Sequence, residues 1–227
     1  MIATQWILFG GIALVSWLVQ MNLQSKFKKY SRISIGNGMT GRDIALKMLH
    51  DNGITDVQVT HTPGQLTDHY NPATKTVNLS EGVYESNSIM AAAVAAHECG
   101  HAVQHARMYA PLQMRSKLVP VVTFASSIMT WVLLAGILLI NTFPYLLGFG
   151  ILLFATTTLF SFITLPVEID ASKRALVWLS SSGLTNVSTH THAEGALRAA
   201  AYTYVVAALG SLATLIYYVM IFMGRRD

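Results

Sequence analysis

Charged side chains are scarce in this chain. Asp, Glu, Lys and Arg make up only 11% of its 227 residues, while 52% are apolar. So large an apolar share excludes an ordinary soluble domain. Cysteine is scarcer still: Cys99 is the only one, which excludes an intrachain disulfide. We expect Cys99 to be a small buried side chain, and a redox or inhibitory thiol is the alternative.

Charge is absent altogether from four long segments, 2–21, 118–140, 143–165 and 201–223. A helix rises about 1.5 Å per residue, so about 20 residues cross a hydrocarbon core of about 30 Å. The first segment has neither a basic n-region nor a small-residue cleavage site, so we expect it to stay as an anchor and not to be a signal peptide. The chain is therefore predicted to be an α-dominated integral membrane protein with four transmembrane helices.

The basic residues orient these segments. Of the 15 Lys and Arg residues, ten lie between the first and second segments and three between the third and fourth, while Arg225 and Arg226 follow the last. The positive-inside rule then places both long connections in the cytoplasm. The N-terminus and the turn at Asn141 and Thr142 are expected on the outer side.

Nucleic acid is not an expected partner, although the net charge is +4. The Lys and Arg residues are distributed as topology determinants and form no stripe interleaved with aromatic residues. Lys26, Lys28 and Lys29 directly follow the first apolar segment. We expect them to contact anionic lipid headgroups.

The segment His97-Glu98-Cys99-Gly100-His101 carries the most chemical information. Positions i and i+4 of a helix lie on one face about 6 Å apart, so both imidazoles can reach one tetrahedral metal, with Glu98 beside a bound water. This is the H-E-x-x-H arrangement of metalloproteases. Residues 89–96 favour a helix, with Asn87 or Ser88 as its N-cap. A helix whose His and Glu side chains are merely solvated or packed is the alternative.

Such a site needs a third protein ligand, and His105 does not qualify. It lies eight residues past His97, about 12 Å along a helix axis, whereas zinc–nitrogen bonds are about 2.0–2.1 Å long. We expect His105 to be solvated or to contact a ligand. Gln104 and Arg107 stand where a metzincin has Gly and His, so that class is excluded.

The remaining acids and histidines on the C-terminal side are Glu168, Asp170, His190, His192, Glu194 and Asp227. Glu168 is the candidate ligand, because Pro166 suits the first turn of a new helix directly after an apolar segment. A carboxylate that only interacts with that helix dipole is the alternative. Gly100 agrees with a ligand from another element, because glycine lets that element approach closely at a helix-propensity cost of up to about 1 kcal/mol.

The region before the motif helix is predicted to contain β-structure. Residues 40–52 form an amphipathic helix that stops at Gly53. Strands are expected at 57–60, 66–70 and 75–79, the last two joined by a turn at 71–74. We expect 76–79 to be an exposed edge beside the motif helix, where an extended substrate pairs its backbone. A sheet that only covers the helix is the alternative.

The predicted domain order follows the chain. Transmembrane helix 1 covers residues 1–22, and a small α+β zincin-like cytoplasmic domain covers residues 23–117. Transmembrane helices 2 and 3 lie within residues 118–165. A cytoplasmic segment with the third ligand covers residues 166–200, and transmembrane helix 4 with the tail covers residues 201–227. Because Glu168 comes shortly after Leu165, the mouth of the site is expected close to the bilayer surface. The expected substrates are membrane proteins, their cytoplasmic segments or unfolded proteins.

Four segments, 66–72, 95–104, 165–172 and 203–205, together with the order of the apolar segments, resemble the bacterial membrane-bound neutral zinc metallopeptidases of the YugP type. The resemblance extends over nearly the whole chain. It implies a gluzincin of the bacterial cytoplasmic membrane that binds Zn²⁺ through His97, His101 and Glu168. It also implies a distant similarity to HtpX-like quality-control proteases and CAAX-prenyl proteases.

In those distant relatives the ligand glutamate lies in an E-x-x-A-D pattern. Glu168 and Ala171 agree with it, but Ser172 stands at the last position and Asp170 lies two residues after the glutamate. The pattern therefore supports Glu168 as the third metal ligand and leaves the role of Asp170 open.

The expected reaction is peptide-bond hydrolysis by a zinc-activated water with Glu98 as the general base, in membrane-protein quality control. The donor to the oxyanion is open among His190, His192, Arg198 and Tyr204. Residues 189–192 equally suit a solvated loop.

Two other functions are compatible with parts of the sequence but are disfavoured. An intramembrane-cleaving metalloprotease is disfavoured because the apolar stretch 89–96 is too short to span a bilayer and no Asp-Gly pair is present. A non-catalytic, zinc-stabilised membrane scaffold that binds partners is disfavoured because structural zinc has no use for the base Glu98. The sequence leaves open a homo-oligomer and a regulatory membrane partner.

Overall fold

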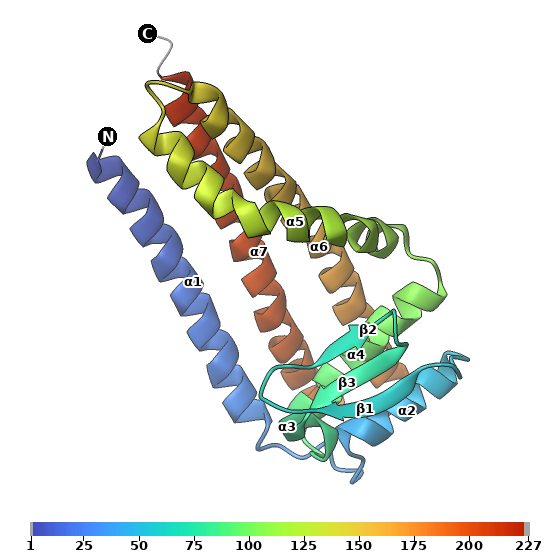
Figure 1. Cartoon of the computed structure of the whole chain (residues 1–227). Helices are drawn as coiled ribbons and strands as arrows, with labels where there is room; N and C mark the ends of the chain where they lie inside the picture. Colours follow the sequence, from blue (N-terminus) through green and yellow to red (C-terminus); the bar gives the residue numbers. More distant parts are fainter. Residues whose placement is uncertain (1, 225–227) are drawn as a thin grey trace. The chain divides into compact units, whose positions relative to one another are not determined.

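The computed structural model describes residues 2–224, so Arg225, Arg226 and Asp227 lie outside the described residues. Helices are α1 (Ile2–Tyr30), α2 (Gly41–Asp51), α3 (Glu81–Tyr84), α4 (Ile89–Ala106), α5 (Ala110–Leu138), α6 (Pro144–Ser181) and α7 (Val187–Met223), and strands are β1 (Gln58–Thr62), β2 (His69–Asn71) and β3 (Thr76–Ser80) (Figure 1). They fall into two compact units. One comprises Met1–Trp17, Gln113–Pro166 and Tyr204–Asp227, and the other Leu18–Leu112 and Val167–Thr203.

Four helices are long and apolar enough to cross a membrane, at Trp6–Tyr30, Ala110–Leu138, Pro144–Ser181 and Val187–Met223. Each contains most of one of the four segments predicted from the absence of charge, and each also extends beyond that segment. The prediction of an α-dominated membrane protein with four such helices and a small mixed sheet is therefore confirmed.

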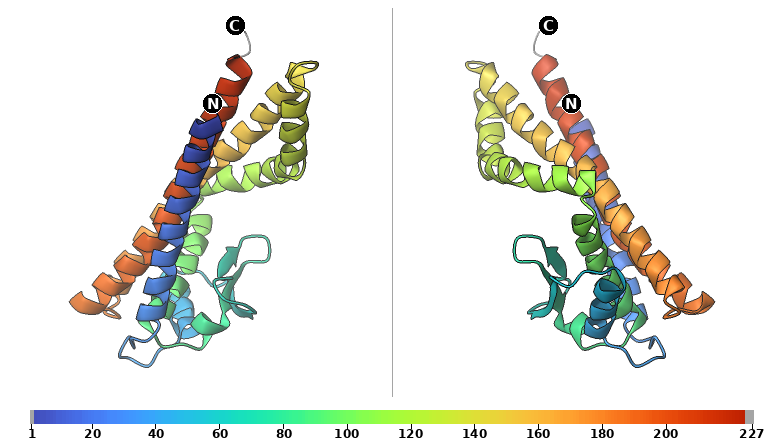
Figure 2. Two further views of the ribbon diagram at one scale, coloured as in Figure 1. Left: turned by 90° about the vertical axis from the view of Figure 1, so that its left-hand side faces the viewer. Right: turned by 90° about the vertical axis from the view of Figure 1, so that its right-hand side faces the viewer.

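In the first unit, helices contact one another closely at a glycine and through aromatic rings. Helices α5 and α6 form a hairpin with a short turn, seen from both sides in Figure 2. A Cβ atom on Gly136 would lie 2.6 Å from the Cα of Leu147, so only glycine allows this approach. Between α1 and α7, the rings of Phe9 and Tyr217 meet edge to face with centroids 5.3 Å apart.

The second unit contains the sheet, whose strand order is β1-β3-β2. β2 and β3 pair antiparallel, which confirms the predicted hairpin, and β1 pairs with β3 in parallel. The expectation that 76–79 forms the edge is wrong, because β3 is the central strand (Figure 1). Val77 and Leu79 are fully buried, as a central position requires, and the strand that contacts α4 at an edge is β2.

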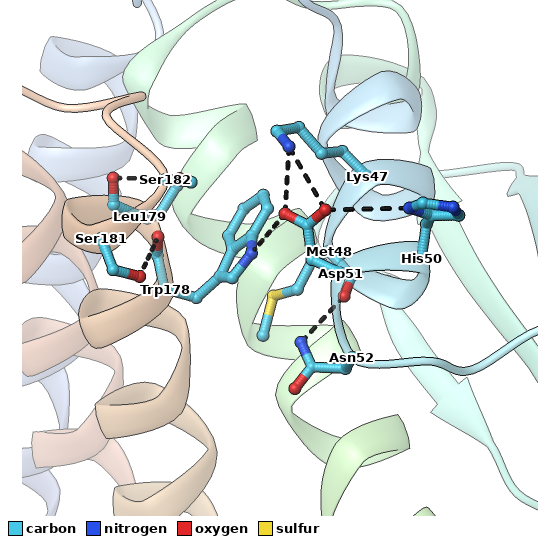
Figure 3. A network of polar contacts seen from close by, with 9 residues as sticks. All are labelled: Lys47, Met48, His50, Asp51, Asn52, Trp178, Leu179, Ser181 and Ser182. Atoms are coloured by element: carbon cyan, nitrogen blue, oxygen red, sulfur yellow. Dashed lines mark hydrogen bonds and ion pairs between the residues drawn. The ribbon is translucent and has the colours of Figure 1, made fainter.

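Helix α2 covers α4 and agrees with its prediction. The Thr40 side chain accepts a hydrogen bond from the Asp43 N–H in a capping box, and Gly53 ends the helix with a φ of +69°. At its other end, Asp51 accepts hydrogen bonds from Lys47 Nζ at 3.0 Å and from Trp178 Nε1 at 3.1 Å (Figure 3). This network fastens α2 to the C-terminal part of α6.

The expected helix start at Pro166 is wrong, and so is the loop that was left open as an alternative for residues 189–192. Pro166 does not begin a helix but lies inside α6, which runs unbroken from Pro144 to Ser181. A proline removes one main-chain hydrogen bond, and strongly helical segments on both sides tolerate that loss. Residues 189–192 are not a loop but the first turns of α7. Both errors arose because long transmembrane helices continue beyond the apolar segments.

Candidate metal centre

Three side chains from two helices converge in the second unit. His97 and His101 come from α4, and Glu168 comes from α6. Glu168 Oε2 lies 3.3 Å from His97 Nε2 and 3.6 Å from His101 Nε2. One ligand atom from each residue lies within 4.8 Å of the others. Two imidazole nitrogens and one carboxylate oxygen are the donor set of a zinc site with an open position.

Glycine in the motif allows this convergence. A Cβ atom on Gly100 would lie 2.6 Å from the carbonyl oxygen of Ala171 and 3.1 Å from its Cα. Both are main-chain atoms of α6, which have little freedom to move aside. The predicted close approach at Gly100 is therefore confirmed, and α6 is the element that approaches.

The position of Glu168 in α6 excludes the alternative that this carboxylate only interacts with the dipole at a helix N-terminus. Glu168 lies more than twenty residues into α6, so it does not interact with a helix N-terminus there. Only 3% of its surface is exposed. A carboxylate buried this deeply is costly unless a cation or charged partner compensates it. A divalent cation between this carboxylate and two imidazoles supplies that compensation, so the residues present fit zinc.

The pKa of His101 also indicates that this site favours a positive charge. Burial lowers the pKa of His101, but the hydrogen bond that His101 donates to Glu168 and the negative charges of Glu98 and Glu168 raise it by more, so the pKa lies above its usual value. Metal ligation needs a neutral imidazole, so a raised pKa makes a proton compete more strongly with zinc at His101.

Each histidine is oriented by a second hydrogen bond through its other nitrogen. Nδ1 of His97 lies 3.1 Å from Ser172 Oγ. When Nε2 binds a metal, Nδ1 carries the ring proton and donates it to this hydroxyl. Ser172 occupies the place where the distant relatives have Asp. A neutral hydroxyl thus supports His97 in this chain.

His101 is supported by Gln104, which is fully buried. Its Oε1 accepts from His101 Nδ1 at 3.0 Å, while its Nε2 donates to the Val167 carbonyl and to Asp170 Oδ2, both at 2.8 Å. The two acceptors around Nε2 fix the orientation of the amide, and hence the His101 tautomer. Asp170, which also binds Arg174, therefore reaches the site through Gln104.

Gln104 and Ser172 are not among the site residues that the sequence predicts. In the sequence, Gln104 only excludes the metzincin class, and Ser172 only departs from the E-x-x-A-D pattern. Gln104 stands three residues after His101 on the same helix face, which is a signal that the sequence does contain. Ser172 had no such signal, because its partner lies in another helix.

Glu98 is held by the sheet. Its Oε2 accepts a hydrogen bond from the main-chain N–H of Tyr70 in β2 at 3.0 Å, and its exposed fraction is 8%. The hydroxyl of Tyr70 bonds Nδ1 of His105 at 2.8 Å. His105 is therefore outside the cluster of three, as the spacing predicted, and it supports the strand that holds Glu98.

Cys99 points away from the histidines. It is fully buried, and its Sγ lies 3.5 Å from the carbonyl oxygen of Ala45 in α2. Burial raises the pKa of the Cys99 thiol far above its usual range, so it stays protonated. The prediction of a small buried side chain is confirmed.

The candidate oxyanion donors stay predictions. His190 contacts Thr185 Oγ1 at 3.2 Å, His192 stacks on Tyr30 with ring centroids 5.0 Å apart, and the third candidate, Arg198, binds the hydroxyl of a neighbouring tyrosine. His190 and Arg198 line a groove of about 670 Å³, to which Ser172 also belongs. The fourth candidate, Tyr204, belongs to the other unit.

Comparison with known proteins identifies the family of this chain. A family described as "Putative neutral zinc metallopeptidase" covers residues 5–223. The chain is 44% identical over 213 residues to the "Putative membrane protease YugP" of Bacillus subtilis (strain 168), and the alignment covers 94% of each protein. No solved structure is significantly similar. With four candidate membrane helices and a donor set suited to zinc, the chain belongs to this family of neutral zinc metallopeptidases.

Proposed function

We propose that this chain is a membrane-bound zinc endopeptidase in which His97, His101 and Glu168 hold the metal and Glu98 is the general base. The observation that carries the proposal is the convergence of the three donors from α4 and α6. Zinc in such a site lowers the pKa of a water molecule and polarises the scissile carbonyl.

The protein's own contribution is to place a base and hold it. Glu98 takes the proton of the attacking water and delivers it to the leaving amine. The Tyr70 N–H fixes Glu98 Oε2, which leaves Oε1 for this proton transfer. A scaffold with a purely structural zinc has no need for a carboxylate held in this way.

The substrate enters as an extended segment along β2. This strand is the edge of the sheet that contacts α4, and main-chain pairing gives affinity with little side-chain selectivity. Such binding suits unfolded proteins and flexible cytoplasmic segments of membrane proteins, as in membrane-protein quality control. The intramembrane alternative is weaker, because α4 is not among the four candidate spans in the described residues.

The proposed topology follows the charges. The domain 23–117 and the segment 166–200 lie in the cytoplasm, and the helices in 1–22, 118–165 and 201–227 cross the bacterial cytoplasmic membrane. Both parts of the metal centre fall on the same side in this arrangement, although the positive-inside rule takes no account of the motif. That agreement supports an active site facing the cytoplasm.

The proposal is tested by cleavage of a loosely folded membrane protein by the purified protein in detergent with zinc. Glu98→Gln keeps the three ligands and removes the base, so we expect equal zinc content and at least about a 100-fold loss of rate. Glu81→Gln, which changes an exposed glutamate in α3, serves as the matched control and should cleave normally. Cleavage by Glu98→Gln at the wild-type rate would refute the role of Glu98. Equal zinc without cleavage by either protein would favour the scaffold.

A further inference from the structure

We propose that the end of α1 and the loop before β2 form a binding site for the headgroup of an anionic phospholipid. The cavity has a volume of about 560 Å³ and is lined by Gln24, Lys28, Ser31 and Arg32 from the α1 end and by Gln65 and Leu66 from the loop. All of these residues belong to the second unit.

The charges in this cavity are all positive. Lys28 and Arg32 are its ionisable residues, and no acidic side chain lines it. Neither cation has an ion pair with any of residues 2–224. Two cations that share one cavity without a carboxylate attract a phosphate group.

A buried hydroxyl adds a directional contact. Ser31 Oγ is buried and has no hydrogen-bond partner within the described part of the chain. Buried polar groups in proteins nearly always have a partner, so an orphaned hydroxyl at a cavity wall marks a place for a ligand oxygen. A phosphate group suits this lining, because its oxygens accept hydrogen bonds from hydroxyl groups and from cationic side chains.

The position along α1 selects a lipid as the source of the phosphate. Gln24 and Lys28 follow Met21, the last residue of the first apolar segment, by three and seven residues. At 1.5 Å per residue this is about 5 to 10 Å past the hydrocarbon, which is the depth of the headgroup layer. A soluble phosphate has no reason to prefer this depth.

The site is joined to the peptidase centre by a short piece of chain. Leu66, with a φ of +58°, lies in the loop that leads into β2, and four residues later the Tyr70 N–H holds Glu98. A headgroup bound at the cavity fixes this loop and thereby the strand that orients the base. This regulatory consequence rests on the proposed function, whereas binding of the lipid does not.

The test measures retention of labelled phosphatidylglycerol by the purified full chain in detergent, with phosphatidylcholine as the neutral reference. Lys28→Gln is compared with Lys29→Gln, since Lys29 is its neighbour, is exposed and does not line the cavity. Both variants lose the same charge. We expect about fivefold weaker binding for Lys28→Gln, from about 1 kcal/mol per basic residue, and less than a twofold change for Lys29→Gln.

An equal loss of phosphatidylglycerol binding in both variants would overturn the proposed site, because it would show only nonspecific electrostatic attraction of the lipid to basic residues. Hydrogen exchange of residues 63–70 gives a second readout, and we expect protection by phosphatidylglycerol in the wild type but not in Lys28→Gln. Equal protection from hydrogen exchange by inorganic phosphate would assign the cavity to a soluble anion and overturn the proposal that it binds a lipid. Lipid binding with unchanged peptidase activity would overturn the regulatory step alone, while loss of activity in Glu98→Gln tests the proposed function separately.

Discussion

At the scale of single residues, the centre depends on contacts one layer away from the ligands. Ser172 supports His97 through a hydroxyl, and Gln104 supports His101 through an amide. These neutral partners fix the ring orientation without adding negative charge beside Glu168. Metal affinity is therefore expected to depend on Ser172 and Gln104, which are not part of the H-E-x-x-H motif.

Ser172→Ala is expected to weaken zinc binding by about tenfold to 100-fold, because Nδ1 of His97 loses its partner. Competition with a chromogenic chelator measures the affinity. Ser180→Ala removes an exposed hydroxyl from the same helix and should leave the affinity unchanged. Equal affinities for the two variants would show that Ser172 does not position His97.

The pH dependence of zinc binding reports on His101. The pKa of His101 in the metal-free protein lies above its usual value of 6.5, and the metal must displace that proton. Zinc affinity should therefore fall as the pH decreases, beginning at a pH above that of a free histidine. Titration with zinc at a series of pH values measures this, and an affinity that stays constant down to about pH 6 would contradict the protonated state.

At the scale of helices and strands, the close crossing of α4 and α6 makes the site. Gly100→Ala places a Cβ against the main chain of Ala171, and we expect a loss of about 1–3 kcal/mol in stability together with weaker zinc binding. Thermal unfolding in detergent measures the first effect. Gly82→Ala in α3, where an added Cβ has no atom within 4 Å, is the control and should unfold like the wild type.

The elements themselves were largely predictable, but their pairing was not. The helix at 40–52, the hairpin and the four apolar helices follow from local patterns of capping, turn residues and charge. The position of β3 in the centre depends on parallel pairing with β1, and no local pattern in the sequence encodes that pairing. The three candidate ligands, which the structure brings together, could be selected from the sequence because the chemistry of zinc limits the candidates. Identifying Ser172 and Gln104 as their partners required the fold.

At the scale of the whole molecule, the account requires both long connections to lie in the cytoplasm. The chain suits cysteine labelling, because its one cysteine is fully buried and its thiol stays protonated. With a membrane-impermeant maleimide, Asn141→Cys should react in intact cells and Ala73→Cys only after permeabilisation. The reverse pattern would place the site on the outer side.

The zinc content of the purified protein tests the central claim most directly. The wild type should hold about one zinc ion per chain, and His97→Ala, His101→Ala and Glu168→Gln should each lose it. His105→Ala removes a histidine one helical turn beyond His101 that is not a ligand, so it should keep the metal. If Glu168→Gln retained zinc with wild-type affinity, or if His105→Ala lost it, the assignment of the site to α4 and α6 through these three residues would be wrong.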